Sequence, residues 1–297
     1  MARLRRAVAA AGALGVGCVA YGTLIERRWY RLRRVRIDGA LRRPGRLTVL
    51  HLSDVHLLPG QDHRVRFLTS LAAADHDLVV ITGDLLGAPG AEDLAVATVG
   101  GLTSPDRPGL VVLGSNDLYG PVLKSPFAYF TAPDRRVHGE PLDTERLLEG
   151  LERHGYRTLR GEAVVIDTRA GPVAAGGFDD PHLDPTVIPA VGAVTPPAGA
   201  AGVLVSLGVV HAPYTAALDV LVDAGHDLLL AGHTHGGQVR MPGIGALVAN
   251  CDLPLDQARG VSRYRDRWLH VSPGLGHSRY APFRFACRPE ATLLELT

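Results

Sequence analysis

Short runs of valine, leucine and isoleucine recur along most of this 297-residue chain, and helix-like stretches separate them. The clearest runs cover residues 47–52, 77–82, 110–113, 203–210 and 228–231. Strands that are apolar along their whole length are buried on both faces, as happens when helices cover a sheet. The pattern therefore predicts an α/β fold built in layers.

Weaker patterns predict further strands at residues 163–167, 173–176, 268–271 and 291–296, and helices at about 62–74, 91–101 and 215–224.

The composition, 46% hydrophobic and 21% charged, is ordinary for a globular protein and excludes a disordered chain or a coiled coil. The three cysteines, Cys18, Cys251 and Cys287, are too few and too scattered for a disulfide framework or a cysteine zinc site.

The N-terminal segment is the one long apolar stretch. Residues 7–25 carry no charge and have arginines on both sides. A helix of this length spans roughly 28 Å, close to the thickness of a bilayer core. We expect a single membrane anchor; the alternatives are an export signal cleaved near Cys18 and Ala20, or a soluble or interfacial helix.

Charge is distributed unevenly. Residues 1–36 hold nine arginines and one acid, Glu26, which gives +8 and leaves −7 for the rest of a chain whose net charge is +1. An acidic body argues against a nucleic-acid partner. More arginines follow the apolar segment than precede it, which favours the cytoplasmic side for the body, with an exported form as the alternative. The same arginines suit an anionic headgroup layer.

Five of the predicted strands are followed by polar residues that could bind a metal. They are Asp54 and His56, Asp84, Asn116 with Asp117, His211, and His233 with His235. In open α/β sheets ligands bind beyond the carboxyl ends of the strands, so these groups can converge. We also expect Asp54 and His56 to face one cation, because side chains two apart in an extended chain share a face. Imidazole and oxygen donors without thiolate suit Mn, Fe or Zn, and this many ligands suits two divalent metal ions.

Other polar residues are expected to have ordinary roles. The remaining nine histidines, among them His138, His182 and His277, are interpreted as structural, and Asp179-Asp180 as part of a turn. The stretch from Tyr119 to Glu140 is rich in proline and aromatic residues. It could line a substrate pocket, touch lipid or form a small satellite core.

The order D-x-H, G-D, G-x-N, H and G-H-x-H resembles the calcineurin-like metallophosphoesterase superfamily over residues 47 to about 237. Residues 272–276 and 283–285 are similar to its membrane-associated bacterial branch, the YkuE-like proteins. The resemblance implies a four-layer α-β-β-α sandwich of two mixed sheets flanked by helices, here preceded by a hydrophobic N-terminal helix. We therefore expect an anchor or signal segment with its polybasic stretch at residues 1–36 and a catalytic domain at residues 46–297.

The resemblance also implies which residues hold the metals. Asp54, His56 and His235 would hold the first ion, and Asn116, His211 and His233 the second. Asp84 would bridge both, since a carboxylate offers two anionic oxygens. Two such cations activate a water molecule and neutralise the charge that develops on the phosphoryl oxygens.

One motif departs from the family. Its usual G-N-H-D or G-N-H-E carries a histidine that assists the leaving group, whereas this chain reads Gly114-Ser115-Asn116-Asp117. Asp117 would then stand in place of that histidine, and Asp84, Asn116 and Asp117 are the candidate catalytic residues. Asp117 could be a general acid only if its pKa were raised, and nearby cations would lower that pKa. It could instead orient a histidine or bind metal, with His138 or His182 as the acid.

We therefore expect a metal-dependent phosphoesterase that hydrolyses phosphodiester or phosphomonoester bonds. The N-terminal segment and the family branch favour a membrane phospholipid or a nucleotide-sugar-lipid as substrate. The replacement of the family's histidine by Asp117 predicts weak activity on substrates with poor leaving groups. The alternative is a catalytically weak, membrane-tethered protein that binds phosphorylated lipids or envelope partners.

Overall fold

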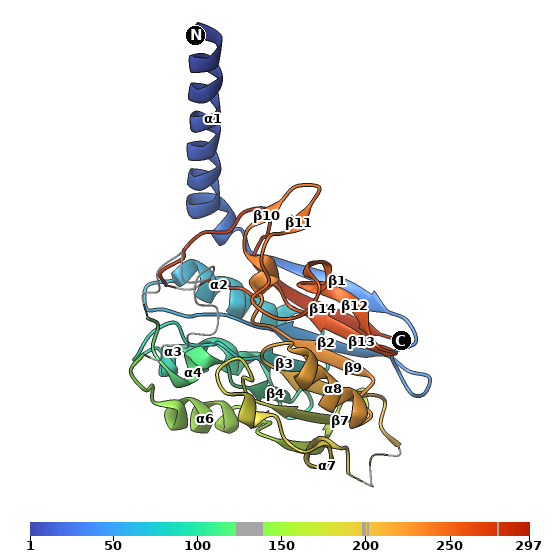
Figure 1. Ribbon diagram of the computed structural model, residues 1–297. Coiled ribbons are helices and arrows are strands. Elements are labelled where there is room, and N and C mark those ends of the chain that lie inside the picture. Colours follow the sequence, from blue (N-terminus) through green and yellow to red (C-terminus); the bar gives the residue numbers. More distant parts are fainter. Residues whose placement is uncertain (123–138, 198–199, 201, 278) are drawn as a thin grey trace.

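The computed structural model describes residues 1–122, 139–197, 200, 202–277 and 279–297. Two six-stranded sheets form the centre of the body. The first runs in the order β1-β14-β2-β3-β4-β5, and the second in the order β12-β13-β9-β8-β7-β6 (Figure 1). Both sheets contain parallel and antiparallel pairs. The predicted pair of mixed sheets is confirmed.

The strands of the first sheet are Arg31–Ile37 (β1), Glu290–Leu296 (β14), Leu47–Leu52 (β2), Leu78–Thr82 (β3), Gly109–Val112 (β4) and Tyr156–Thr158 (β5). Those of the second are Gly260–Tyr264 (β12), Arg267–Val271 (β13), Leu228–Ala231 (β9), Ser206–Val210 (β8), Gly171–Phe178 (β7) and Glu162–Thr168 (β6). A short hairpin, Arg240–Met241 (β10) and Gly245–Ala246 (β11), stands apart from both.

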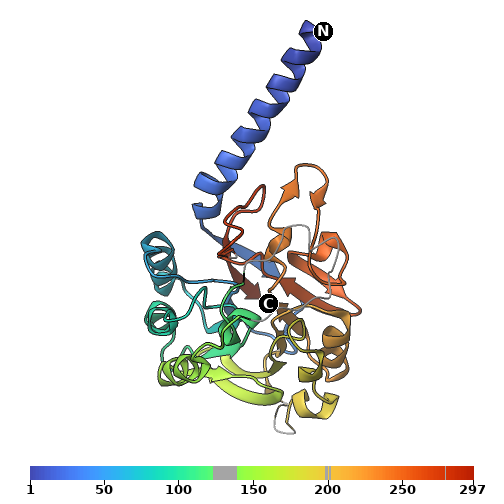
Figure 2. The same ribbon diagram turned by 60° about the vertical axis from the view of Figure 1, so that its left-hand side comes forward.

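Helices cover the outer face of each sheet. Those against the first sheet are Asp62–Ser70 (α2), Glu92–Val99 (α3) and Thr144–Arg153 (α6). Those against the second are Val191–Val194 (α7) and Thr215–Asp223 (α8). The short helix Ser115–Leu118 (α4) follows β4. Figure 2 shows the layers from a second direction.

Side-chain alternation along the buried strands divides the core into three parts. In β2, Leu50 and Leu52 pack beneath the helices of the first sheet, whereas Leu47 and Val49 point between the two sheets. A third cluster fills the space between the second sheet and α8. Each inner strand thus buries both of its faces, which is why its sequence is apolar without interruption. The layers are α-β-β-α, as predicted.

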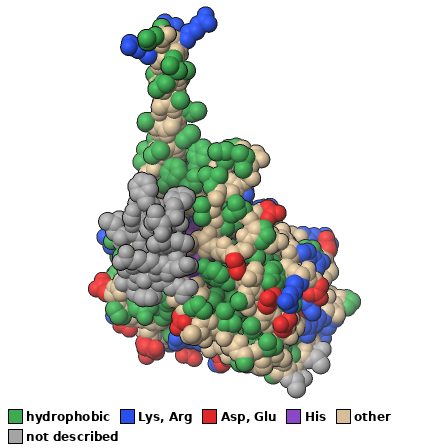
Figure 3. Space-filling view, viewed as in Figure 1, with side chains coloured by type: hydrophobic (Ala, Val, Ile, Leu, Met, Phe, Trp, Pro, Cys, Tyr) green, Lys and Arg blue, Asp and Glu red, His purple; other side chains and the backbone are tan. Residues whose placement is uncertain are grey.

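The N-terminal helix stands away from the body. Ala2–Ala20 (α1) continues through short π and 3₁₀ turns to Arg28, and almost none of this apolar segment is buried (Figure 3). By length and composition it could cross a membrane, and a signal sequence has the same features.

The foot of this helix is fixed to the body. The Glu26 carboxylate is almost fully buried and accepts backbone N–H bonds from Ala286 (2.9 Å) and Cys287 (2.7 Å). The Arg284 N–H donates to the carbonyl of Gly22 at 3.3 Å. Strand β1 then pairs with β14 in parallel. Of the segment expected as the anchor, residues 31–36 therefore belong to strand β1 of the first sheet, and Glu26 is bound to the body.

We predict that His226 makes the fold sensitive to mild acid. Its ring is buried between the hydroxyl of Ser206 (2.8 Å) and the carbonyl of Val194 (3.0 Å), and burial lowers its pKa to about 4. The unfolded chain therefore takes up this proton near pH 6.5, well before the folded one does. Neutral His226 therefore makes its full contribution to the stability of the folded state above pH 6.5. As the pH falls towards 4, the contribution of this group to the free energy of unfolding decreases by about 3 kcal/mol.

Urea unfolding at pH 8, 6.5 and 5 would measure this effect. His226→Gln should show a shallower decline in stability than the wild type, whereas His154→Gln, at an exposed position, should keep the wild-type slope. An unchanged slope in the His226 variant would show that this residue does not titrate as described.

Candidate metal centre

The predicted ligands lie in loops at the carboxyl ends of the central strands. Five of them have a left-handed backbone: Asp54 (φ 49°), His56 (φ 45°), Asp84 (φ 55°), His233 (φ 66°) and His235 (φ 50°). Such angles are uncommon outside glycine and concentrate at functional sites. The extended geometry expected for residues 54–56 is therefore wrong, because β2 ends at Leu52 and the chain turns at both ligands.

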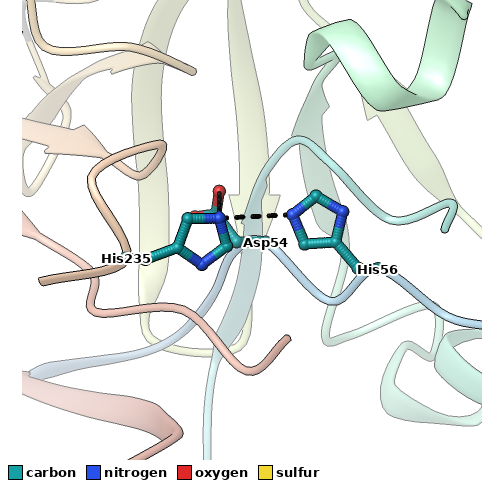
Figure 4. Close-up of side chains that lie close together, drawn as sticks. All are labelled: Asp54, His56 and His235. Carbon is teal, nitrogen blue, oxygen red and sulfur yellow. Dashed lines mark hydrogen bonds and ion pairs between the residues drawn. The ribbon is translucent and has the colours of Figure 1, made fainter. Parts of the chain in front are cut away.

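Asp54, His56 and His235 form the first cluster (Figure 4). The Nε2 atoms of His56 and His235 are 3.3 Å apart, and Oδ1 of Asp54 lies 3.6 Å from Nε2 of His235. Oδ2 of Asp54 accepts bonds from the Ser53 hydroxyl (2.5 Å) and from the His233 N–H (2.9 Å).

The other carboxylate oxygen of Asp54 indicates what the first cluster binds. Oδ1 is buried and has no hydrogen-bond donor among the described residues. A buried anionic oxygen without a donor is costly unless a cation contacts it. The two imidazole nitrogens beside it are the kind of ligand that Mn, Fe and Zn accept. The first cluster therefore fits a divalent metal ion.

Asp84 lies between the two halves of the site. Its Oδ2 is 3.5 Å from Nε2 of His56 and 3.7 Å from Nε2 of His211. Asn116 holds both of its oxygens, through its backbone N–H to Oδ1 (2.8 Å) and its side-chain Nδ2 to Oδ2 (2.8 Å). One carboxylate thus faces both clusters.

His211 and His233 form the second cluster together with Asp180. Nδ1 of His211 donates to the carbonyl of Thr82 at 2.6 Å, which leaves Nε2 facing Asp84 and Asp180. That Nε2 lies 3.3 Å from Nδ1 of His233. Each imidazole thus has a ring nitrogen directed into the site.

Asp180 is the residue that sequence reasoning missed, since it was interpreted as part of a turn. Its Oδ2 lies 4.0 Å from Nε2 of His211 and accepts the backbone N–H of Ser115 at 3.2 Å. Asp180 comes two residues after Phe178, the last residue of β7. The rule that identified the other ligands, a polar residue just beyond a buried strand, would have found it.

Asp117 lies beneath the site and ties two of its loops together. Its Oδ2 accepts the backbone N–H groups of Asp84 (2.7 Å) and Gly114 (3.0 Å), and its Oδ1 accepts that of Leu86 (3.0 Å). The side chain is fully buried. Both oxygens are thus engaged by backbone amides of the loops that carry Asp84 and Asn116.

Burial and mutual repulsion dominate the electrostatics of the site. Burial raises the pKa of Asp84 to about 6 and that of Asp117 to about 7, and it also raises the pKa of Asp54. Burial opposes charge on His211, but Asp84, Asp180 and Asp54 outweigh it and raise the pKa of that imidazole to about 10. The carboxylates thus attract a proton to His211, a charge that a divalent cation would replace.

His56 and His235 behave differently from His211. Burial lowers the pKa of both imidazoles well below the usual value. They are therefore neutral near pH 7, the form in which histidine binds a metal.

Of the two histidines considered as proton donors, His182 lies beside the second cluster. Its ring centroid is 4.5 Å from that of His233, and its Nδ1 is 2.7 Å from the hydroxyl of Tyr214. His138 and most of the aromatic stretch, residues 123–138, lie outside the described residues.

Comparison with known proteins agrees with this geometry. The sequence profile of the calcineurin-like phosphoesterases matches residues 47–237, more than half of the chain. Phosphodiesterase YaeI of Escherichia coli is 33% identical over 54% of this chain and only 55% of its own length. The uncharacterized metallophosphoesterase YkoQ of Bacillus subtilis is 29% identical over 84% of both chains, and YkuE of the same species 27% over 83% and 76%.

Solved structures give more distant similarities. The protein TT1561 of Thermus thermophilus is 13% identical, with a TM-score of 0.41 over 77% of this chain and 90% of its own. An archaeal phosphodiesterase is 11% identical, with a TM-score of 0.38 over 79% and 86%. The family profile matches residues 47–237, a range that includes all the predicted ligands. This match shows that the chain belongs to the calcineurin-like phosphoesterase family.

Proposed function

We propose that this protein is a metal-dependent hydrolase of phosphoester bonds. The observation that carries the proposal is that two clusters of buried ligands meet at one carboxylate, Asp84. The family supports the same reaction, and the name of YaeI favours a phosphodiester substrate.

In this proposal Asp54, His56 and His235 would hold the first ion, and Asn116, His211 and His233 the second. Asp84 would serve both ions, and Asp180 would add an oxygen ligand next to His211. When bound, such a pair of divalent ions supplies Lewis acidity and a water-derived nucleophile at neutral pH. The set of imidazole and oxygen donors suits Mn, Fe and Zn.

The chain's own residues orient and support this chemistry. Asn116 fixes the orientation of Asp84 through two hydrogen bonds, and Asp117 holds the loops of both residues by binding their backbone. We therefore assign Asp117 a positioning role. Hydrolysis adds water across one P–O ester bond and releases an alcohol, and we propose His182, which lies beside the second cluster, as the group that supplies the proton of this alcohol.

A membrane lipid is the substrate we favour. The exposed apolar helix supports it, because an anchored enzyme meets lipid phosphoesters at the bilayer surface. A soluble phosphorylated small molecule is the broader class. The second candidate function is that of a weakly active, membrane-tethered binding protein. It is favoured because both carboxylate oxygens of Asp117 accept backbone hydrogen bonds, so that neither is free to act in place of the family's histidine.

Replacing the shared carboxylate should abolish activity. We predict that Asp84→Asn lowers Mn²⁺-dependent hydrolysis of bis-p-nitrophenyl phosphate by about a hundredfold or more, since several kcal/mol of charge stabilisation depend on the ions. Elemental analysis should show that it retains less metal than the wild type. Asp93→Asn, at an exposed position, is the control. Full turnover in the Asp84 variant would refute the mechanism, and a wild type that binds two ions without turnover would favour the binding function.

The Asp180 carboxylate should stabilise the second ion specifically. We predict that Asp180→Asn weakens one of the two metal-binding steps by about 10–100-fold and leaves the other unchanged, as loss of a carboxylate at one of two sites should do. Titration of chelator-treated protein with Mn²⁺ would measure it. The matched control is Asp179→Asn, because that neighbour binds Leu113 and Arg160 instead. Equal effects of the two substitutions would remove Asp180 from the ligand set.

We also propose that the first helix anchors the body to the membrane, on the cytoplasmic side by the arginine distribution. A reporter fused after Thr297 tests the side. Activity of a cytoplasm-specific reporter is expected, together with full-length protein in the membrane fraction. Activity of a periplasm-specific reporter, with a shortened N-terminus, would instead indicate the exported form.

A further inference from the structure

A basic cavity lies at the foot of the N-terminal helix, apart from the metal centre. It has a volume of about 350 Å³, and none of the predicted metal ligands lines it. A second cavity of about 340 Å³ adjoins it and shares Arg28, Tyr30 and His63 with it. The linings come from the helix foot, the start of α2 and His277.

The charge of these cavities is strongly positive. Arg27, Arg28 and Arg64 line the first, and Arg66 the second. Among the described lining residues Asp62 is the single acid. The ion pairs within the described part of the chain include none of these four arginines. Arginines that converge without ion-pair partners form a site for an anion.

Burial of the charged Arg64 side chain costs free energy that a bound anion would offset. This side chain is only 3% exposed. Its guanidinium donates to the carbonyls of Val55 (2.6 Å) and His56 (2.7 Å) and to the hydroxyl of Tyr30 (3.0 Å), all of them neutral acceptors. A buried cation with neutral partners is stabilised further by a negatively charged ligand.

The position of the cavity indicates where that ligand comes from. Arg27 and Arg28 are the last residues of the segment long enough to span a membrane. The next residue, Trp29, is 51% exposed and lines the second cavity with Tyr30 and Phe67, whose rings stack at 5.2 Å. Tryptophan and tyrosine collect at membrane interfaces, where arginines attract anionic headgroups.

We propose that this basic cavity binds the phosphate of an anionic phospholipid headgroup at the membrane surface. The site is separate from the metal centre, but Arg64 lies in its wall and also bonds the carbonyl of the predicted ligand His56. The inference rests on the proposed membrane position of the first helix and does not depend on phosphoester hydrolysis.

Trp29 provides a direct readout, because the chain has two tryptophans and Trp268→Phe leaves Trp29 alone. The full-length Trp268→Phe protein, treated with chelator and held in a non-ionic detergent, is titrated with dihexanoyl phosphatidylglycerol. Parallel titrations use dihexanoyl phosphatidylcholine and inorganic phosphate. Because metal is absent, neither turnover nor the metal centre contributes to the signal, so failure of the proposed function would not affect the result.

We expect saturable binding of phosphatidylglycerol, weakened about tenfold by Arg28→Ala and further by Arg27→Ala with Arg28→Ala, as loss of a charge-assisted hydrogen bond predicts. Arg28→Lys should retain part of the affinity. The matched control Arg33→Ala removes an exposed arginine of the same basic stretch outside the cavity and should bind like the parent. Asp84→Asn should also bind lipid normally.

Three results would overturn the inference. Equal affinity for phosphatidylcholine would show that the phosphate headgroup's net charge is not recognised. An equal loss in Arg33→Ala would reduce the effect to general attraction between basic residues and anionic lipid. Inorganic phosphate binding as tightly as the lipid, with the same dependence on Arg28, would assign the cavity to a soluble anion.

Discussion

The site depends on one buried carboxylate, Asp84, whose position is fixed by hydrogen bonds from the protein itself. Asp84 and His56 follow strands β3 and β2 of the first sheet, whereas His211 follows strand β8 of the second. Oδ2 of Asp84 lies 3.5 Å from Nε2 of His56 in the first cluster and 3.7 Å from Nε2 of His211 in the second. Its position is set by Asn116 at its oxygens and by Asp117 at its backbone. The packing of one sheet against the other therefore determines the distance between the two clusters.

Folding the loops of the predicted ligands into these conformations costs free energy, which the packing of the two sheets offsets. Five ligands have left-handed backbones, each of which costs on the order of 1–3 kcal/mol in a residue that is not glycine. Gly83, beside Asp84, permits the close approach of Gly114, since an added Cβ would lie 2.5 Å from the Gly114 nitrogen. Three buried core layers keep the strand ends fixed, so the loops cannot relax.

The C-terminal segment connects the helix foot to the metal centre. Glu26 binds the backbone of Ala286 and Cys287, and Cys287 Sγ lies 3.3 Å from the carbonyl of His235. Arg284, fully buried, lies with Nη2 3.3 Å from Nδ1 of the same histidine. The base of the apolar helix is thus connected to a predicted ligand through contacts of the C-terminal segment.

The sequence by itself determined most strands of the two sheets, the order of the predicted ligands along the chain, and the apolar N-terminal helix, because hydrophobic runs and strand-end residues are local features. It did not reveal β1, whose arginines mask an edge strand, nor β5 and β12, nor the contacts of Asp180 and Asp117. Nor did it show the arginine cavity. These features were decided by the tertiary structure, because each depends on residues distant in the chain that only the packing of the two sheets and the C-terminal segment brings into contact.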